Sequence, residues 1–170
     1  MPYVIVVSDN HGLTTELQQI KEHHPDAKAF IHCGDSELEY HAKEMDQFHK
    51  VRGNCDFDTA YPEDINISVD HFNIFVTHGH LYQVKTTLMP LSYRAEELGA
   101  NVICFGHSHI PGVEQVGDRL YLNPGSIRIP RGGTEKTYAK VSWNDENSVK
   151  VEFLNLDAHA IPTMTREFLL

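Results

Sequence analysis

The chain has 170 residues, of which 41% are hydrophobic and 22% charged, ordinary values for a globular protein that buries one core. Its 14 Lys and Arg residues against 24 Asp and Glu residues give a formal net charge of -10, which opposes extended binding to nucleic acids. No apolar run approaches the ~20 residues that span a bilayer, so no membrane partner is expected. We expect a single domain over residues 1–158 and a loosely held C-terminal tail over residues 159–170.

The three cysteines indicate a reducing compartment. Cys33, Cys55 and Cys104 are odd in number and show no Cys-x-x-Cys spacing, so neither a disulfide framework nor a structural zinc site is expected. The chain enters its first apolar run at Tyr3 without a basic region or a cleavage site before it. Together these features predict a cytoplasmic protein and leave its oligomeric state open.

The first half of the chain predicts strands that alternate with helices. Nearly continuous Val and Ile over residues 3–8 predict a strand that is buried on both faces. Three apolar residues then recur at helical spacing before a proline, and they predict an amphipathic helix: Leu13, Leu17 and Ile20. Short apolar runs predict two further strands, at 29–31 and 48–51, with a weak helix or turn over 37–47 between them. Because a crossover helix returns the chain in the same direction, these strands predict a mostly parallel sheet.

The second half of the chain predicts three hairpins, one helix and one buried strand. The hairpins pair residues 65–69 with 72–76, residues 113–116 with 120–122, and residues 138–143 with 149–154. The helix lies over residues 88–98, with Pro90 in its first turn and Gly99 as its C-terminal cap. The hairpins predict a second sheet that is antiparallel or mixed. The expected fold class is therefore α/β, a four-layer α/β/β/α sandwich of two mixed β-sheets face to face, flanked by helices.

Side chains of the types that bind metals follow five of the predicted strands, each time at a sharp turn. The most distinctive motif is Gly106-His107-Ser108-His109, in which two imidazoles follow an apolar run. Four other strand ends have the same layout: Ser8-Asp9-Asn10-His11-Gly12, His32-Cys33-Gly34-Asp35, Gly53-Asn54-Cys55-Asp56 and Thr77-His78-Gly79-His80. Because open α/β sheets keep their sites at the carboxyl ends of strands, we expect these motifs to meet.

Seven residues of these motifs offer oxygen or nitrogen ligands without a thiolate: Asp9, His11, Asp35, Asn54, His78, His107 and His109. Mixed carboxylate and imidazole sites suit Mn, Fe, Co, Ni or Zn better than Mg or Ca. Seven ligands are too many for one such ion, so two ions that share one carboxylate are predicted. Two ions about 3.5–4 Å apart polarise a phosphoryl oxygen and lower the pKa of a bridging water, which is the chemistry of phosphoester hydrolysis.

The motifs Asp-x-His, Gly-Asp, Gly-Asn-Cys-Asp, Gly-His and Gly-His-x-His occur in this order from Val4 to about Ser126. In this respect the chain resembles the calcineurin-like metallophosphoesterase superfamily. Its small size and the Gly-Asn-Cys-Asp motif resemble the short bacterial and archaeal phosphodiesterases of the YfcE type. The resemblance implies a four-layer sandwich that hydrolyses a small phosphodiester by means of a water or hydroxide activated by two divalent ions, most often Mn.

The resemblance also implies roles for the seven ligands. The first ion would be held by Asp9, His11 and His109. The second would be held by Asn54, His78 and His107, and Asp35 would bridge the two ions. The candidate catalytic residues are Asp35, Asn54 and His78.

Cys55 departs from the family pattern. Many relatives carry a His at this place, in Gly-Asn-His-Asp or Gly-Asn-His-Glu, and that His is thought to protonate the leaving group or to position the substrate. A thiol with a pKa of about 8.5 replaces an imidazole poorly in either role. We therefore expect slow turnover of esters with poor leaving groups and faster turnover of activated aryl esters.

Three residues are candidates for contact with the substrate: Cys55, His80 and Arg128. The stretch Asn123-Pro124-Gly125-Ser126, followed by Arg128 and Arg131, forms a turn whose N–H and guanidinium groups suit phosphate oxygens. A loop with solvated arginines is an equally good interpretation of the same residues. His32 is interpreted as a hydrogen-bonded interior histidine.

A metal-binding scaffold of the same fold, with little or no catalysis, is the alternative function. The small subunit of the eukaryotic retromer coat has this fold and serves mainly in protein contacts. A scaffold does not need a complete ligand set, whereas all seven positions carry competent ligands here. The complete set favours the enzyme and leaves open its physiological substrate, its native metal and any general acid.

Overall fold

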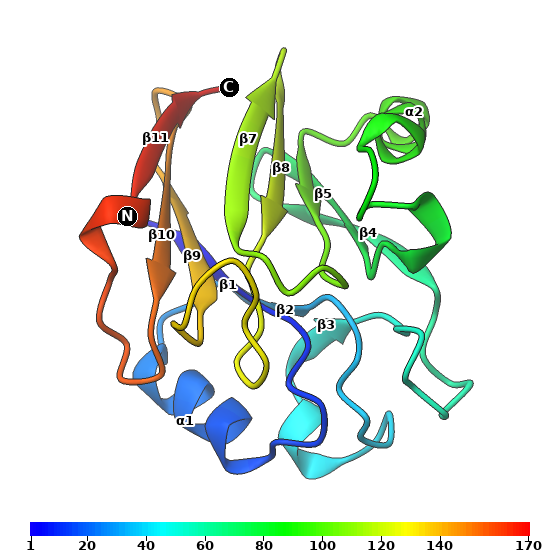
Figure 1. Ribbon diagram of the computed structural model, residues 1–170. Helices are drawn as coiled ribbons and strands as arrows, with labels where there is room; N and C mark the ends of the chain where they lie inside the picture. Colours follow the sequence, from blue (N-terminus) through cyan, green and yellow to red (C-terminus); the bar gives the residue numbers. More distant parts are fainter.

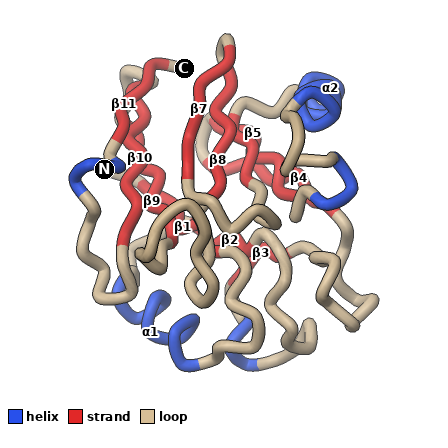
Figure 2. Tube along the Cα trace, viewed as in Figure 1, coloured by secondary structure: helices blue, strands red, loops and turns tan.

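The computed structural model describes residues 1–170 and contains two β-sheets with two α-helices (Figures 1 and 2). In chain order the elements are β1 (Tyr3–Val7), α1 (Thr15–His23), β2 (Ala29–His32), β3 (Phe48–Lys50), β4 (Asp64–Val69), β5 (Phe72–Thr77), α2 (Met89–Leu98), β6 (Val102–Cys104), β7 (Gly112–Val116), β8 (Arg119–Asn123), β9 (Tyr138–Trp143), β10 (Ser148–Leu154) and β11 (Arg166–Leu169). Short 3-10 helices lie at Lys43–Met45, His80–Tyr82 and Pro162–Met164. The strand order is β11-β10-β9-β1-β2-β3 in the first sheet and β4-β5-β6-β8-β7 in the second.

Strand β1 shows why a continuous run of Val and Ile suits a strand with two buried faces. Side chains alternate across a strand, so Val4 and Val6 join the core between the sheets, whereas Ile5 and Val7 pack with the helix α1. Leu17 and Ile20 are the fully buried residues of that helix. One strand therefore contributes to two of the three hydrophobic clusters of the protein.

Helix α2 covers the outer face of the second sheet through a third cluster. Leu91 and Ala95 are fully buried against side chains of β5, β6 and β8. The helix begins with a proline among its first two residues and ends at Gly99, whose φ of 63° is the left-handed conformation that glycine adopts readily. None of the helices combines the length and the apolar character that a bilayer span requires.

The three clusters define four layers: helix α1, the first sheet, the second sheet and helix α2. Figure 1 shows the two helices on opposite outer sides of the paired sheets. Both sheets mix parallel and antiparallel pairs. The expected fold class is confirmed, while the assignment of residues 1–158 to a single domain stays a prediction.

Two expectations about the second half of the chain are wrong. The hairpin of β9 and β10 belongs to the first sheet, where β9 pairs antiparallel with β1 and places Tyr3 opposite Ser142. The parallel pair of β1 and β2 leaves the other edge of β1 without partners, and β9 satisfies its backbone groups. The expected loose tail over residues 159–170 instead supplies β11, which pairs antiparallel with β10 and shields part of its edge.

The parallel strands bring the ligand motifs to one end of the sandwich. Strands β1, β2 and β3 run in the same direction in the first sheet, as do β5, β6 and β8 in the second. The proposed ligands lie in the loops that follow β1, β2, β3, β5 and β6. The core between the sheets, in which Val6, Val76 and Cys104 are buried, therefore sets the distance between the two groups of loops.

Substitution of Leu91 by Ala tests the packing of α2. Leu91 is fully buried, so the lost contacts and the cavity should lower the free energy of unfolding by about 2–5 kcal/mol. Urea unfolding followed by circular dichroism measures the change. Tyr93 is the matched control, because it lies on the same helix with an exposed fraction of 60%, and its replacement by Ala should cost at most about 0.5 kcal/mol. Equal effects of the two changes would contradict the assignment of the buried face.

Candidate metal centre

The loops at this end of the sandwich adopt an unusual backbone conformation. Five of the proposed ligands have positive φ angles, in the left-handed region that residues with a side chain rarely enter: Asp9 (57°), His11 (41°), Asp35 (57°), His107 (71°) and His109 (61°). Each such residue costs of order 1 kcal/mol or more, and such residues concentrate at functional sites. The surrounding contacts therefore hold these loops in a backbone conformation that is locally unfavourable but brings their polar side chains together.

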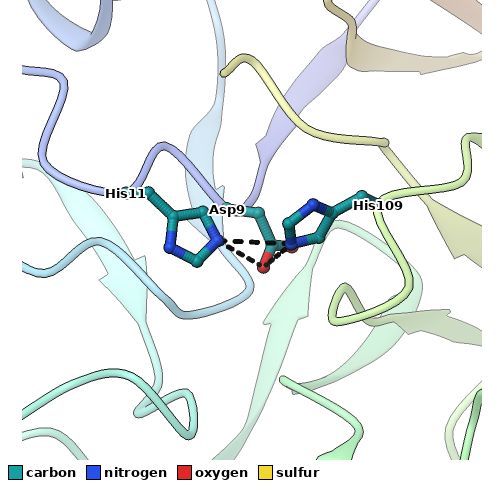
Figure 3. A group of neighbouring side chains, drawn as sticks. All are labelled: Asp9, His11 and His109. Carbon is teal, nitrogen blue, oxygen red and sulfur yellow. Dashed lines mark hydrogen bonds and ion pairs between the residues drawn. The ribbon is translucent and has the colours of Figure 1, made fainter. Parts of the chain in front are cut away.

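Asp9, His11 and His109 form the first group of the centre. The Oδ1 atom of Asp9 lies 3.2 Å from Nε2 of His109 and 3.6 Å from Nε2 of His11, and the two nitrogens are 3.2 Å apart. Figure 3 shows the two imidazoles pointing toward Asp9 from opposite sides. Asp9 is fully buried, and its Oδ1 has no hydrogen-bond partner, although Ser8 Oγ donates to Oδ2 at 2.6 Å.

His78, Asp35 and Asn54 form the second group. Nε2 of His78 lies 3.1 Å from Oδ2 of Asp35, 3.0 Å from Oδ1 of Asn54 and 3.9 Å from Oδ1 of Asp9. Asp35 Oδ2 is also 3.9 Å from Nε2 of His11, so both carboxylates lie between the two groups. Six of the seven proposed ligands thus place a ligand atom within 4 Å of another.

His107 lies at the margin of the second group. The centroid of its ring is 5.1 Å from that of His78. The ring nitrogens of His107 lie farther from the carboxylates of Asp9 and Asp35 than the Nε2 atoms of His11, His78 and His109 do. Its backbone N–H donates to Oδ2 of Asp9 at 3.1 Å. The side chain is half-buried, and its pKa is lowered to about 4, mainly by burial and then by the charges of His78 and Lys85.

Each central imidazole is oriented by a hydrogen bond from its outer nitrogen. Nδ1 of His109 donates to the carbonyl oxygen of Ile129 at 2.8 Å, and Nδ1 of His78 donates to that of Cys33 at 2.7 Å. Nδ1 of His11 lies 2.8 Å from a carboxylate oxygen of Glu37. Because a carbonyl or carboxylate oxygen accepts, each Nδ1 carries hydrogen, and in a neutral ring Nε2 then presents its lone pair to the centre.

The donor set fits divalent cations. Lone pairs of three Nε2 atoms meet buried carboxylate oxygens, and one of these, Oδ1 of Asp9, lacks any donor. Such groups repel one another unless positive charge lies between them. Imidazoles that are held through Nδ1 by a carbonyl or a carboxylate are typical of metal ligands.

The pKa values show how strongly the centre attracts positive charge. Burial alone would raise the pKa of Asp9, but His109 and His11 overcome this effect and hold it far below its usual range. Burial would also raise the pKa of Asp35, but the hydrogen bond and the charge of His78 hold it below its ordinary value. Asp9 raises the pKa of His11 to about 9 against the effect of burial. The centre therefore binds protons tightly, and a metal ion would compete for the same lone pairs.

Asp56 supports the centre without contributing a ligand. Its buried carboxylate accepts the backbone N–H groups of Asp35 at 2.9 Å, Glu37 at 2.8 Å and Gly53 at 2.7 Å. It thereby fixes the loops after β2 and β3 together. This role was not predicted from the sequence, although Asp56 belongs to the Gly-Asn-Cys-Asp motif and could have been recognised from it.

The turn after β8 also braces the centre. Ser126 Oγ donates to the carbonyl oxygen of Asp9 at 2.8 Å, and Asn123 Nδ2 donates to that of Gly106 and to Ser108 Oγ, both at 3.0 Å. These side chains are buried, so this part of the proposed phosphate turn holds the metal loops in place. A grip on phosphate by its backbone N–H groups is not supported at Arg128 and Ile129, whose N–H groups donate to Ser126 Oγ.

The three candidates for substrate contact all lie beside the centre. The backbone N–H of Cys55 donates to Oδ1 of Asp35 at 2.8 Å, and burial together with the charge of Asp35 raises the pKa of its thiol to about 11. The ring of His80 lies 5.4 Å from that of His78, and its buried Nδ1 has no partner. Nη1 of Arg128 donates to the carbonyl oxygen of His11.

His32 lies behind the centre as a fully buried, hydrogen-bonded residue, as predicted. Its Nδ1 accepts the backbone N–H of Gly34 at 3.0 Å, so Nε2 is the donor to the side-chain oxygen of Asn10 at 2.7 Å. Burial lowers the pKa of His32 to about 4, which keeps the ring neutral.

Comparison with known proteins gives the same assignment as the motifs. The model of the calcineurin-like phosphoesterase superfamily domain matches residues 3–146. The probable metallophosphoesterase YsnB of Bacillus subtilis is 47% identical over 149 residues, which are 86% of this chain and 88% of that protein. The phosphodiesterase YfcE of Escherichia coli is 34% identical over 108 residues, 58% of this chain and 54% of YfcE.

The fold matches solved structures over nearly the whole length of the chain. A protein of Streptococcus pneumoniae, described as a predicted phosphoesterase, is 36% identical and has a TM-score of 0.94. The match covers 98% of this chain and 97% of that protein. Vacuolar protein sorting 29 of Cryptosporidium parvum has a TM-score of 0.79 over 99% and 98% of the two chains, but at 16% identity this likeness shows the fold alone. The chain belongs to the calcineurin-like phosphoesterase superfamily.

Proposed function

We propose that the protein is a phosphodiesterase that works with two divalent metal ions. The observation that carries this proposal is the buried Oδ1 of Asp9, which has no donor although two imidazole nitrogens face it within 3.6 Å. The first ion would be held by Asp9, His11 and His109, and the second by Asn54, His78 and His107, with Asp35 between them. The position of His107 supports its part in this set less strongly than the positions of the other six residues do.

The residues of the chain prepare the site for phosphoester hydrolysis. Bound ions would polarise phosphoryl oxygens and lower the pKa of a water molecule. Hydrogen bonds to Ile129 O and Cys33 O hold two of the imidazoles in a fixed orientation, so little reorganisation is needed during the reaction. Asn54 is exposed, whereas Asp9 is fully buried, so substrate reaches the centre from the side of the second group.

A diester suits this site better than a monoester. The chain carries a formal net charge of -10, and a diester carries one negative charge where a monoester carries nearly two at neutral pH. The likeness to YfcE, which is named a phosphodiesterase, supports the same choice. Mn is the proposed metal, because mixed imidazole and carboxylate ligands suit transition ions better than Mg. Because its three cysteines are free thiols, the enzyme is proposed to work in the cytoplasm.

Metal removal and replacement test the proposed reaction. The protein is treated with a chelator and supplied separately with Mn, Ni, Co, Zn or Mg, and hydrolysis of bis(p-nitrophenyl) phosphate is compared with that of p-nitrophenyl phosphate. A transition ion should restore cleavage, with the diester preferred. The change Asp35→Asn should lower the rate by about 100-fold or more, since it removes a charged ligand.

The same assay distinguishes the enzyme from the scaffold alternative. Metal binding in calorimetry without hydrolysis of either ester would contradict the enzyme and favour an interaction scaffold. Preference for the monoester would contradict the proposed substrate class alone.

The substitution Gly106→Ala tests whether the loop of His107 and His109 must approach Asp9 this closely. A Cβ atom at Gly106 would lie 2.1 Å from Ser8 Oγ and 2.6 Å from Oδ2 of Asp9, so the carboxylate must move. Affinity for Mn, measured by calorimetry on chelator-treated protein, should fall by about tenfold or more. Gly133→Ala is the matched control, because a Cβ there meets no atom within 4 Å. Unchanged affinity in Gly106→Ala would show that the displaced groups are not ligands.

The substitution Cys55→His tests whether an imidazole at this position, as in many relatives, speeds the reaction. The Cys55 thiol has a pKa of about 11 and donates its proton poorly, so a histidine should raise the rate on an alkyl diester by about tenfold or more. The rate on a nitrophenyl diester should change little, because its leaving group departs without a proton. Cys55→Ser is the control for the loss of the thiol. No gain on the alkyl diester would refute the proposed role of this position.

A further inference from the structure

A pocket of about 550 Å³ opens beside the metal centre on the outer face of the second sheet. Its floor includes Phe105, Tyr121 and Asn123, and one wall includes Val84, Lys85 and Leu88. The opposite wall includes Ile110 and Arg131. We call this hollow the side pocket. Its volume lies within the range of sites for small molecules.

The strand register explains why the floor of the side pocket is open. Gly112 pairs with Asn123 and Glu114 pairs with Tyr121, and residues that pair directly across two strands share a face of the sheet. Gly112 therefore faces the pocket. A Cβ atom at this position would meet no atom within 4 Å, so the absence of a side chain leaves space above the strand.

The side pocket adjoins the loops of the metal centre. Ser108, which lines it, stands between the proposed ligands His107 and His109. The backbone N–H of Arg131 donates to the carbonyl oxygen of His109 at 3.0 Å. On the opposite wall, Val84 packs so closely on Gly79, the residue after His78, that a Cβ there would lie 2.6 Å from it. Ligand loops of the centre thus form two walls of the pocket.

Two cations without ion-pair partners line an otherwise mainly apolar surface. Lys85 and Arg131 are exposed, and neither has a carboxylate within 4 Å of its charged nitrogens or a hydrogen bond from its side chain. In a chain with a net charge of -10 they create a local positive field. Glu114 is the acidic residue of the lining, and it lies two residues along β7 from Gly112, away from the ligand loops.

We propose that the side pocket binds one ester group of the phosphodiester substrate, and that it selects an aromatic group that carries a negative charge. This inference rests on the proposed function, since it assigns the second substituent of the phosphate that reacts at the metal centre. The apolar side chains of Val84, Ile110 and Tyr121 suit a planar ring, and Lys85 and Arg131 suit an anionic substituent on it. A small alkyl ester would leave these apolar side chains in contact with water.

Binding of unreactive diester analogues to the Mn-loaded protein tests the inference without turnover. The probes are dimethylphosphinate, methyl(phenyl)phosphinate and methyl(4-carboxyphenyl)phosphinate, which contain no ester bond, and calorimetry gives their dissociation constants. The phenyl compound should bind about tenfold more tightly than the methyl compound, as five further carbon atoms in contact allow. The carboxylate should add about threefold, the usual effect of an exposed ion pair.

Variants separate the apolar contribution from the charged one. Gly112→Phe, which fills the pocket, should remove the preference for phenyl, and Ile110→Asn should reduce it if Gly112→Phe fails to fold. The double variant Lys85→Met with Arg131→Met should remove only the gain from the carboxylate. Gly133→Phe is the matched control, because a Cβ there also meets no atom within 4 Å and this residue does not line the pocket, and it should keep both preferences.

The outcomes distinguish this inference from the function on which it rests. Equal binding of the methyl and phenyl compounds, or a phenyl preference that survives in both Gly112→Phe and Ile110→Asn, would overturn the inference even if diesters are hydrolysed. A phenyl preference that Gly112→Phe removes would support it even in a protein that fails to hydrolyse diesters, and in that case the proposed function alone would be wrong.

Discussion

The need for positive charge among the atoms around Asp9 is the constraint on which the rest of the structure depends. Oxygen and nitrogen atoms that repel one another unless a proton or a cation lies between them are held within 4 Å in a buried place. They stay there because the loops that carry them are fixed from behind, by Asp56, Ser126 and the carbonyl oxygen of Cys33. The surrounding protein thus holds together a set of lone pairs that binds positive charge, either protons or a metal ion.

The centre is shared between the two sheets, so its geometry depends on how they pack. Asp9 and Asp35 follow strands of the first sheet, whereas His78 and His109 follow strands of the second. The hydrogen bond from His78 to Cys33 O crosses between the sheets. A change in the core between the sheets, far from any ligand, would therefore alter the distances within the centre.

The parallel strands of the first sheet, and the meeting of the proposed ligands at one end of the sandwich, could be predicted from the sequence. The continuous Val and Ile of β1 and the turns at Asp9 and Gly106 are local signals, and each ligand lies within a few residues of the strand that positions it. The hairpin pattern of β9 and β10 predicts only that the two strands pair with each other. Whether β9 then joins one sheet or the other depends on the free edge of β1, which periodicity does not report.

The supporting residues were harder to predict, because their roles depend on contacts between distant parts of the chain. Glu37 orients His11 across 26 positions and Ser126 braces Asp9 across 117. Neither residue has a side chain that is diagnostic of its role, and both lie in loops. Such contacts become visible only when the sheets are assembled.

The position of β1 also has a consequence for how the protein folds. This strand lies at the middle of the first sheet, yet its antiparallel neighbour β9 comes from near the opposite end of the chain. During synthesis, one edge of a highly apolar strand must wait without a partner until residues 138–143 are available. Pairing over so long a separation is slow, so the nascent chain is exposed to aggregation at β1 for most of its synthesis, and a chaperone that covers this edge would act on it early.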